Sequence, residues 1–299
     1  MAYSLTYSVG GTTYTLSGYD ATTGMTINYM GDQGFGMAPM HRITQRGPLQ
    51  QGDSDIDFRL DPRVLQVPLF VDATTIAEHY AVRAKLMQIF TPSNIVGTLT
   101  VTVDSFVRSI DVEVLGGLTM DIDVKAGYSV RAVVQLRAAD PTWYDPTPQV
   151  ITLTPSIAGA AFAIPMAIPL TMGTASINST TTVSYDGTWL SYPIITAIGP
   201  ITGLSITNNT TGDVISLGAV VIGAGTTYIF DLRYGYKTVK TTAGVNRIQD
   251  VTAGSNLATF AIVPAPTATG GVNSITITSS SSSSPAEVSL TYYTRYIGI

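Results

Sequence analysis

Six charged residues, at every second position from 53 to 63, are the pattern in this sequence closest to a chemical site. They are Asp53, Asp55, Asp57, Arg59, Asp61 and Arg63. On an extended strand all six would project from one face. Asp-x-Asp-x-Asp also begins the EF-hand calcium loop, but that loop needs Gly at position six and Glu at position twelve. Phe58 and Val64 stand there instead, so the pattern predicts a charged strand face that is solvated, meets another subunit or lines a channel.

Other residue types that support catalysis or metal binding are scarce. The chain has no cysteine and only two histidines, His41 and His79, and we expect both histidines at a surface or an interface. A metal site requires several converging ligands, and no such cluster is visible. The Gly-x-Ser-x-Gly motif of serine hydrolases is also missing. The sequence thus predicts no catalytic residue, no metal and no cofactor.

Glycines at 31, 34 and 36 could in principle cradle a phosphate. A dinucleotide site needs a strand before such a cluster and a helix after it, whereas Gly36 is followed by Met37-Ala38-Pro39. We therefore interpret residues 31–52, including Gly34, as an arm that is mobile alone and reaches a neighbouring subunit.

Aromatic residues in the second half could bind sugars by stacking. The candidate platforms are Trp189 and Tyr192, with Tyr185, Tyr228, Tyr234 and Tyr236 nearby in the sequence. In an all-β domain, tyrosines more often pack across strands. Sugar binding is therefore the second hypothesis, and cross-strand packing is the alternative.

Composition narrows the class of protein. Charged residues make up 12% of the 299, about half the usual ~25%, which suits a subunit covered by neighbours. The net charge is −5; residues 1–146 hold ten Lys/Arg and fifteen Asp/Glu, and 147–299 hold five of each. No basic patch favours nucleic-acid binding. We expect no signal peptide and no membrane span, because the longest apolar stretch, 158–170, is shorter than the ~20 residues required.

The first part of the chain, residues 1–147, is expected to be a β-sandwich with one flanking helix. Residues 5–9 and 12–16 predict a hairpin around Gly10-Gly11, with Tyr7 opposite Tyr14. A helix is expected over 75–90, with a capping box at Thr75 and Glu78 and an apolar stripe. The stripe consists of Ile76, Tyr80, Ala84 and Met87. Strands are expected at 54–71 with a break at Asp61-Pro62, and then near 97–103, 106–115, 118–124 and 128–138, with a turn at 125–127.

The second part, residues 148–299, is expected to be a galectin-like or jelly-roll β-sandwich. The proline-rich segment 140–148 marks the boundary. Short strands separated by turn residues recur from 149 to 296, and one of them is placed near 257–263. Six serines at 279–284 are interpreted as a flexible loop.

The order of these elements resembles the siphophage distal tail protein family. The resemblance is carried by the glycine-rich loop into Gly36-Met37-Ala38-Pro39, the strand Ile56–Leu60, the helix, and the hairpin ending in Ala138–Tyr144. In the second part it rests on Gly203–Asn208 with Gly212, Phe230-Asp231 and Val288–Tyr292. Residues 260–266 are richer in Pro and Ala than the family pattern.

This resemblance implies a virion structural protein rather than an enzyme: a hexameric ring of N-terminal domains that joins the tail tube to the tip hub or baseplate. Its implied partners are other copies of itself, the tail tube protein and the tip hub protein, with the tape measure and receptor-binding proteins as further candidates. Assembly would take place in the host cytoplasm. The candidate ring-contact or channel residues are Asp53, Asp55, Asp57, Arg59, Asp61, Arg63, Gly34, Gly36, His79 and Arg83. The alternative is a carbohydrate-binding adhesion module; a β-sandwich hydrolase is disfavoured because the second part has only five widely spaced acidic residues.

Overall fold

The computed structural model describes residues 3–31, 33–122, 128–153, 176–282 and 285–299, and it is mainly β. The chain divides into two compact units. Residues 1–146 and 296–299 form the first unit, and residues 147–295 form the second. The division expected from sequence, at residue 147, placed 296–299 with the second part. The predicted turn at 125–127 lies outside the described residues.

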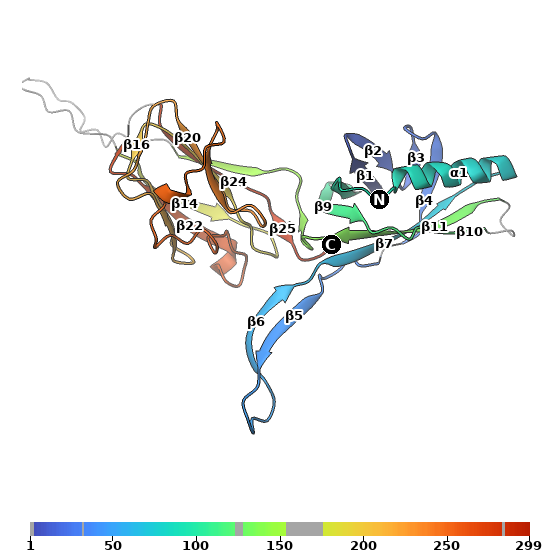
Figure 1. Cartoon of the computed structure of the whole chain (residues 1–299), viewed down its shortest axis with the longest axis horizontal. Helices are drawn as coiled ribbons and strands as arrows, with labels where there is room; N and C mark the ends of the chain where they lie inside the picture. The colour runs from blue at the N-terminus through green and yellow to red at the C-terminus, as the bar shows by residue number, and fades with distance from the viewer. Residues whose placement is uncertain (1–2, 32, 123–127, 154–175, 283–284) are drawn as a thin grey trace, which may run out of the picture. The chain divides into compact units, whose positions relative to one another are not determined.

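The first unit is a β-sandwich flanked by one helix (Figure 1). One layer contains β1 (Tyr3–Val9), β2 (Thr12–Thr15), β8 (Gly97–Val103) and β9 (Phe106–Val114), in the order β2-β1-β8-β9. The other contains β3 (Gly18–Asp20), β4 (Met25–Tyr29), β7 (Arg63–Val71), β10 (Thr119–Ile122) and β11 (Val130–Ala138). The layers join where β9 pairs with β11, and the short β12 (Trp143–Tyr144) pairs with β9.

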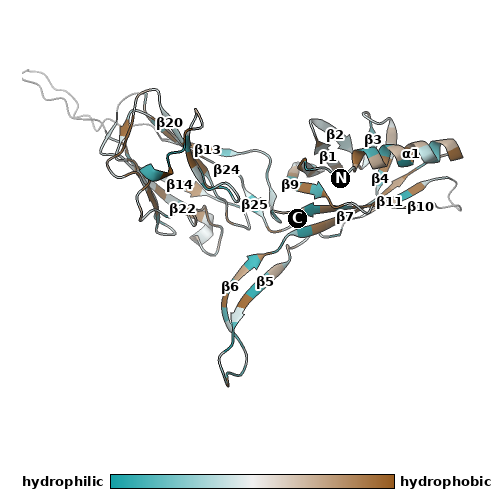
Figure 2. Cartoon of the chain, in the orientation of Figure 1, coloured by the Kyte–Doolittle hydropathy of each residue, from teal (hydrophilic) through white to brown (hydrophobic). Residues whose placement is uncertain are grey.

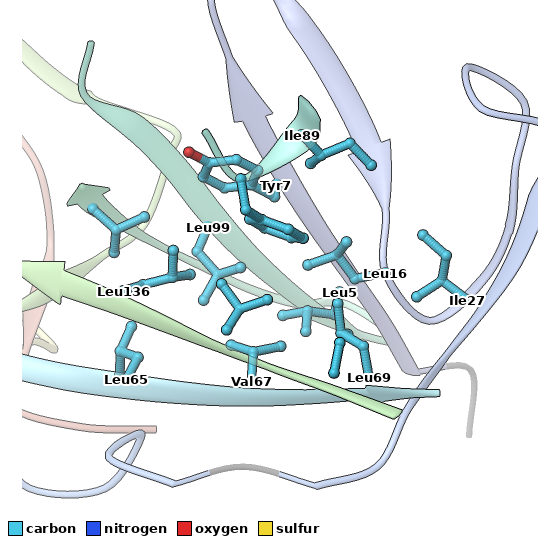
Figure 3. Close-up of a cluster of buried hydrophobic side chains, with 14 of the residues drawn as sticks. Leu5, Tyr7, Leu16, Ile27, Leu65, Val67, Leu69, Ile89, Leu99 and Leu136 are labelled. Carbon is cyan, nitrogen blue, oxygen red and sulfur yellow. The ribbon is translucent and has the colours of Figure 1, made fainter. Parts of the chain in front are cut away.

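The core of this unit is made by the alternating apolar residues of both layers (Figure 3). Leu5 and Tyr7 of one layer and Val67 and Leu69 of the other are almost completely buried. Tyr7 pairs with Tyr14 as the sequence predicts. The turn between their strands holds Gly10 and Gly11 at φ 57° and 80°, which glycine adopts without the steric penalty of a Cβ atom. Local turn chemistry and period-2 burial therefore specify this sheet.

The helix α1 (Ile76–Ile89) begins where the sequence predicts. Thr75 accepts a hydrogen bond from the Glu78 backbone N–H, and the Glu78 carboxylate accepts one from the Thr75 N–H, completing the capping box. Hydrogen bonds from Thr74 to that carboxylate hold the pKa of Glu78 below its ordinary value. The helix therefore starts at a sequence signal that is satisfied entirely by local groups.

The face of α1 that meets the sheet is not the one that the sequence indicated. The buried residues are His79, Val82, Leu86 and Ile89, whereas Ile76, Tyr80, Ala84 and Met87 are exposed. His79 was expected at a surface or an interface, and this prediction is wrong: the side chain is 2% exposed and packs within its own unit. Its Nδ1 lies 2.7 Å from the carbonyl oxygen of Tyr128, so a backbone acceptor satisfies one ring nitrogen on the buried face.

The second unit is also a sandwich, of two antiparallel sheets around a separate core. One sheet has the order β13-β24-β15-β20-β21. Its strands are β13 (Gln149–Leu153), β24 (Glu287–Tyr292), β15 (Ile194–Ile198), β20 (Thr227–Asp231) and β21 (Thr238–Thr241). The other has the order β14-β22-β17-β18, with strands β14 (Asn178–Ser184), β22 (Val272–Thr278), β17 (Ser205–Asn208) and β18 (Asp213–Ser216).

Short elements complete the second unit. They are β16 (Ile201–Thr202), β19 (Val221–Ile222), β23 (Ser281–Ser282), and the 3-10 turns η2 (Ile248–Asp250) and η3 (Thr269–Gly271); β25 (Arg295–Tyr296) spans the unit boundary. Two expectations are wrong. Residues 257–263 form no strand and contribute only a bridge between Ser191 and Ile262. Ser281 and Ser282 of the serine run pair with β16 as β23 instead of forming a loop, and Ser283 and Ser284 lie outside the described residues.

Adjacent substitutions test which face of α1 is structural. Leu86→Ala should lower the free energy of unfolding by about 2–5 kcal/mol, because a fully buried leucine leaves a cavity when truncated. Met87→Ala, at a side chain 53% exposed, should change it by less than about 0.5 kcal/mol. Urea denaturation measures both, and equal losses would show that the two faces are not distinct.

Candidate functional site

A two-stranded ribbon extends from the first unit beyond its sandwich (Figure 1). It consists of β5 (Met40–Gln45), β6 (Ser54–Leu60) and their connecting loop, and we call residues 40–60 the arm. The two strands pair only with each other, in a two-stranded sheet. Every residue of β5, and every residue of β6 except Leu60, is exposed. Because an isolated hairpin is only marginally stable in water, this arm is the part of the unit that most needs a partner.

The arm exposes apolar side chains on its strands and at its tip. They are Met40, Ile43, Leu49, Ile56 and Phe58. Leu49, in the connecting loop, is fully exposed and has φ 65°, a backbone conformation that is uncommon for a residue with a Cβ atom. Hydrophilic and hydrophobic residues alternate along the arm (Figure 2). The arm therefore exposes apolar groups to solvent, where they do not add to the stability of the folded monomer.

The predicted single charged face is interrupted on β6: the pairing shifts between Ile43 and Thr44, which puts Asp55 opposite Thr44 and Asp57 opposite Ile43, on opposite faces of the ribbon. Asp55, Asp57 and Arg59 lie on β6, while Asp53 precedes this strand and Asp61 follows it. Arg42 of β5 forms an ion pair with Asp55 at 3.1 Å, and Arg59 lies 3.6 Å from Asp61. Both pairs are largely exposed, so each contributes at most about 1 kcal/mol to stability. These charges are available to meet complementary groups on a partner.

Arg63 does not belong to that face, and the expectation of a sixth surface charge is wrong. It is the first residue of β7 and is 1% exposed. Its Nη1 donates to the carbonyl oxygens of Gly34 (3.0 Å), Phe35 (3.3 Å) and Gly36 (2.9 Å). Burial lowers the pKa of Arg63 to about 10, and the negative charge of Asp140 acts in the opposite direction. The side chain stays cationic at neutral pH and holds the glycine-rich segment against β7.

Residues 296–299 also bind to Arg63 and to the glycine-rich segment. We call Arg63, residues 34–39 and residues 296–299 the anchor. The Nη2 of Arg63 donates to the carbonyl oxygen of Ile297 at 2.5 Å. The same carbonyl accepts from the Ala38 N–H at 3.0 Å, and the Ile299 N–H donates to the Phe35 carbonyl at 3.1 Å. At the base of the arm the Asp61 N–H donates to the Pro39 carbonyl at 2.9 Å. The arm thus leaves the sandwich from a base that a buried cation and a distant chain segment hold in place.

The glycine-rich segment is therefore part of the anchor and not a mobile arm. Phe35 is buried in the core and its ring lies 5.3 Å from that of Trp143. Gly34 has φ 86°, and a Cβ atom there would overlap the Val64 carbonyl oxygen. At Gly36, by contrast, a Cβ atom would meet nothing within 4 Å. The projecting arm begins only at Met40, after this segment.

The outer face of α1 is a second unpartnered surface of the same unit. Ile76, Tyr80, Ala84 and Met87 form an exposed apolar stripe. Arg83, which lies next to this stripe, is half-buried. The spacing in the sequence identifies this stripe, but spacing alone does not show whether a stripe meets the sheet or the solvent.

The candidate sugar-stacking residues of the second unit are both half-buried. The backbone N–H groups of Thr188 and Trp189 donate to the Arg295 carbonyl at 2.9 and 3.1 Å. The Lys237 ammonium lies 3.5 Å from the centre of the Tyr192 ring. Of the four further tyrosine candidates, Tyr185 and Tyr228 are buried in the core of the unit, whereas Tyr234 and Tyr236 are exposed. Neither named platform therefore offers an unoccupied, fully exposed ring face.

Among the described residues, no three His, Cys, Asp or Glu side chains converge in a way that could hold a metal ion. No helix in the described part of the chain is long and apolar enough to cross a bilayer.

Substitution of two neighbouring glycines tests the anchor. Gly34→Ala should destabilise the first unit by roughly 1–3 kcal/mol or more, because the positive φ and the overlap with Val64 both oppose a Cβ atom. Gly36→Ala should be tolerated within about 0.5 kcal/mol, since the space is open. Thermal and urea unfolding compare the two, and an equal effect would contradict the described geometry.

Replacing Arg63 tests whether it holds the base of the arm. Arg63→Met should leave the Gly34, Gly36 and Ile297 carbonyls without this donor, at a cost of about 1–3 kcal/mol for each one that stays buried and unpaired. Hydrogen exchange at the Ala38 and Ile299 amides should then accelerate at least about ten-fold, which corresponds to about 1.4 kcal/mol. Arg59→Met, at an exposed arm residue, is the control and should leave both amides protected. Unchanged protection in the Arg63 variant would show that the cation is dispensable.

Comparison with known proteins gives one informative similarity. No family model matches the sequence and no curated protein matches it. The structure of the phage SPP1 Dit (gp 19.1) protein, described as a paradigm of the hub adsorption apparatus in phages that infect Gram-positive bacteria, aligns with a TM-score of 0.63 at 13% identity. The alignment covers 97% of this chain and 98% of that one. Two structures of the phage P2 baseplate in its activated conformation, with Ca and with Sr, align over the same shares at TM-scores of 0.46 and identities of 8% and 9%. The chain therefore has the fold of the SPP1 Dit protein along almost its whole length.

Proposed function

We propose that this chain is a structural subunit of a bacteriophage tail tip and not an enzyme. Six copies form a closed ring that joins the tail tube to the hub or baseplate of the tip. Support comes from a fold shared with a phage hub protein over 97% of the chain, and from two exposed surfaces that a monomer leaves uncovered. In this proposal the protein is part of the virion, and its ring assembles in the host cytoplasm.

The observation that carries the proposal is the arm. In the described part of the chain its two strands pair with no third strand, and apolar side chains are exposed along their length and at the tip. Leaving such groups in water gives up the stabilisation of about 25 cal/mol per Å² that burial provides. Hydrogen bonds fix only the base of the arm to the sandwich. These properties suit an element that is stabilised by another molecule.

A ring requires a second, different surface on the same subunit. In a closed ring each copy contacts its neighbours through two different surfaces, because head-to-tail interfaces are heterologous. The outer stripe of α1, with Tyr80 and Met87, is the complementary candidate, since it is apolar and unpartnered. Arg83 beside this stripe and Asp57 on the arm carry opposite charges that suit pairing between copies. The arm of one copy and the helix of the next are thus the proposed contact.

The two units take separate roles in this proposal. The first unit, which holds both candidate contact surfaces, forms the ring, and the second sandwich faces other baseplate components. The proposed partners are other copies of the chain, the tail tube protein and the tip hub protein. The tape measure and receptor-binding proteins are further candidates.

The mass of the purified protein tests the ring. Native mass spectrometry should find a species of six times the 31.6 kDa chain, with a population that rises with concentration because association follows mass action. Leu49→Ser together with Phe58→Ser should shift the protein to monomers, since both residues are exposed apolar groups of the arm. The monomeric variant should remain folded, with an unchanged far-UV circular dichroism spectrum, because neither side chain is part of the core.

Val221→Ser is the matched control. Val221 is an exposed apolar residue of the second unit, so its replacement should leave the oligomer intact. A protein that remains a well-folded monomer at high concentration, and that never appears in purified virions, would rule out the ring.

A further inference from the structure

Strand β14 (Asn178–Ser184) forms one edge of the four-stranded sheet of the second unit. It pairs with β22 through seven consecutive residue pairs without a register shift, and it contains neither a charged residue nor a proline. Natural edge strands are commonly protected from pairing with other chains by charges, prolines, bulges or a covering segment. β14 has none of the first three of these features.

The backbone groups of β14 alternate between β22 and the open side of the sheet. Just before the strand, the Ser279 N–H donates to the Ile177 carbonyl at 2.8 Å, and just after it the Tyr185 N–H donates to the Gly271 carbonyl at 2.9 Å. Because backbone groups alternate in direction along an antiparallel strand, the odd-numbered residues between 177 and 185 also bond to β22. The even-numbered residues point their N–H and C=O groups away from the sheet, and these groups bond to nothing in the described part of the chain. They are Asn178, Thr180, Thr182 and Ser184, and all four side chains are exposed.

The opposite edge of the same sheet is covered by the chain itself. At β18 the Val214 N–H donates to the side-chain oxygen of Asn256 at 3.0 Å, and the Asn256 N–H donates to the Val214 carbonyl at 2.7 Å. The Ser216 N–H donates to the Ser255 hydroxyl at 3.0 Å, and the Ser216 carbonyl accepts from the Thr252 N–H at 2.9 Å. A loop therefore satisfies the outward groups of β18, whereas the outward groups of β14 remain available to an external strand.

Hydroxyl groups hold the side chains beside this open edge in place. The hydroxyl groups of Thr180 and Thr276 lie 2.8 Å apart, across β14 and β22. The side-chain amide of Asn209 donates to the same Thr276 hydroxyl at 2.8 Å and to the Ser274 hydroxyl at 3.1 Å. Threonine is also stiff at χ1 because it is branched at Cβ. The edge is therefore preorganised, and a strand that binds there would not have to order it.

The register selects a second copy of β14 as the occupant of this edge. When two copies pair antiparallel about a two-fold axis, Asn178 can face Ser184 of the second copy while Thr180 faces Thr182 of the second copy. In this register every outward N–H of one strand meets an outward carbonyl of the other. No like charges oppose each other, and threonine pairs are favourable across antiparallel strands. A charged strand from another protein would find no complementary charge on β14.

From these observations we infer that β14 is a self-association site, at which two copies of this chain join their four-stranded sheets into one continuous antiparallel sheet. A two-fold contact uses the same surface on both copies, so it differs from the head-to-tail contact proposed between neighbours in the ring. One pair of strands is a small interface compared with the ~1,200–2,000 Å² of a stable complex, so free chains pair only at high concentration. The inference does not depend on the ring, because every group that supports it lies within the second unit.

Sedimentation equilibrium with the full chain tests the inference. The chain carries Leu49→Ser and Phe58→Ser, which remove the proposed ring contact, so any remaining association is independent of the arm. The mass should rise with concentration from 31.6 kDa toward twice that value. Adding Thr182→Lys should weaken the association at least about ten-fold, because a charge on an edge strand opposes pairing and the two-fold axis brings two lysines together. Thr180→Pro should act similarly, since it removes an outward N–H and leaves the bonds to β22 intact.

Val272→Lys is the matched control. Val272 is exposed on the same face of the sheet but lies on β22, which is not an edge strand, so this variant should associate as before. Circular dichroism establishes that each variant is folded.

Hydrogen exchange gives a second readout of the same contact. The Thr180 and Thr182 amides should exchange rapidly in dilute solution and slowly in concentrated solution, whereas the Thr181 and Val183 amides, which bond to β22, should be protected in both. The inference is overturned if the chain stays monomeric at high concentration, or if the folded Thr182→Lys variant associates as strongly as its parent. Slow exchange of the Thr180 and Thr182 amides in the dilute monomer would also overturn it, because the chain would then cover its own edge.

Discussion

The buried guanidinium of Arg63 is the interaction on which the functional part of the first unit depends. A buried cation is tolerated only when hydrogen bonds replace its lost hydration. Arg63 obtains them from backbone carbonyls of residues 34–36 and of Ile297, which ties two separate chain segments to the start of β7. The direction in which the arm leaves the sandwich is therefore set by the need to satisfy one charge. A lysine would not meet this need equally well, because its ammonium lacks the planar fork that reaches several carbonyls at fixed angles.

Much of the fold could be predicted because its signals are local. The Gly10-Gly11 turn, the Thr75 capping box and the break at Asp61-Pro62 each act within a few residues, and all are where the sequence places them. Which face of α1 packs against the sheet could not be predicted from such local signals. Its apolar residues form two stripes at helical spacing, and only the sheet beneath decides that Leu86 is covered while Met87 is not. Residues 257–263 have a strand-like composition, but apart from one bridge they find no strand to pair with.

The candidate site shows the same division between local and distant causes. Alternation of charges identified β6 as unusual, because that pattern depends only on neighbours in the chain. It failed at Arg63, since Pro62 separates β6 from β7 and the carbonyl groups that capture the guanidinium include one at position 297. No sequence pattern links positions 63 and 297. The exposure of Tyr234 and Tyr236 was equally hidden, because composition counts aromatic residues without indicating which ones a turn lifts out of the core.

The return of residues 296–299 to the first unit has a consequence for the order of folding during synthesis. The ribosome releases the first 146 residues long before Ile297 exists, so in a nascent chain Arg63 and the Ala38 amide lack an acceptor that the finished unit provides. Until translation reaches that point, the base of the arm is incomplete and the apolar tip at Leu49 has no fixed direction. Docking of residues 296–299 is therefore a late step in the folding of the first unit.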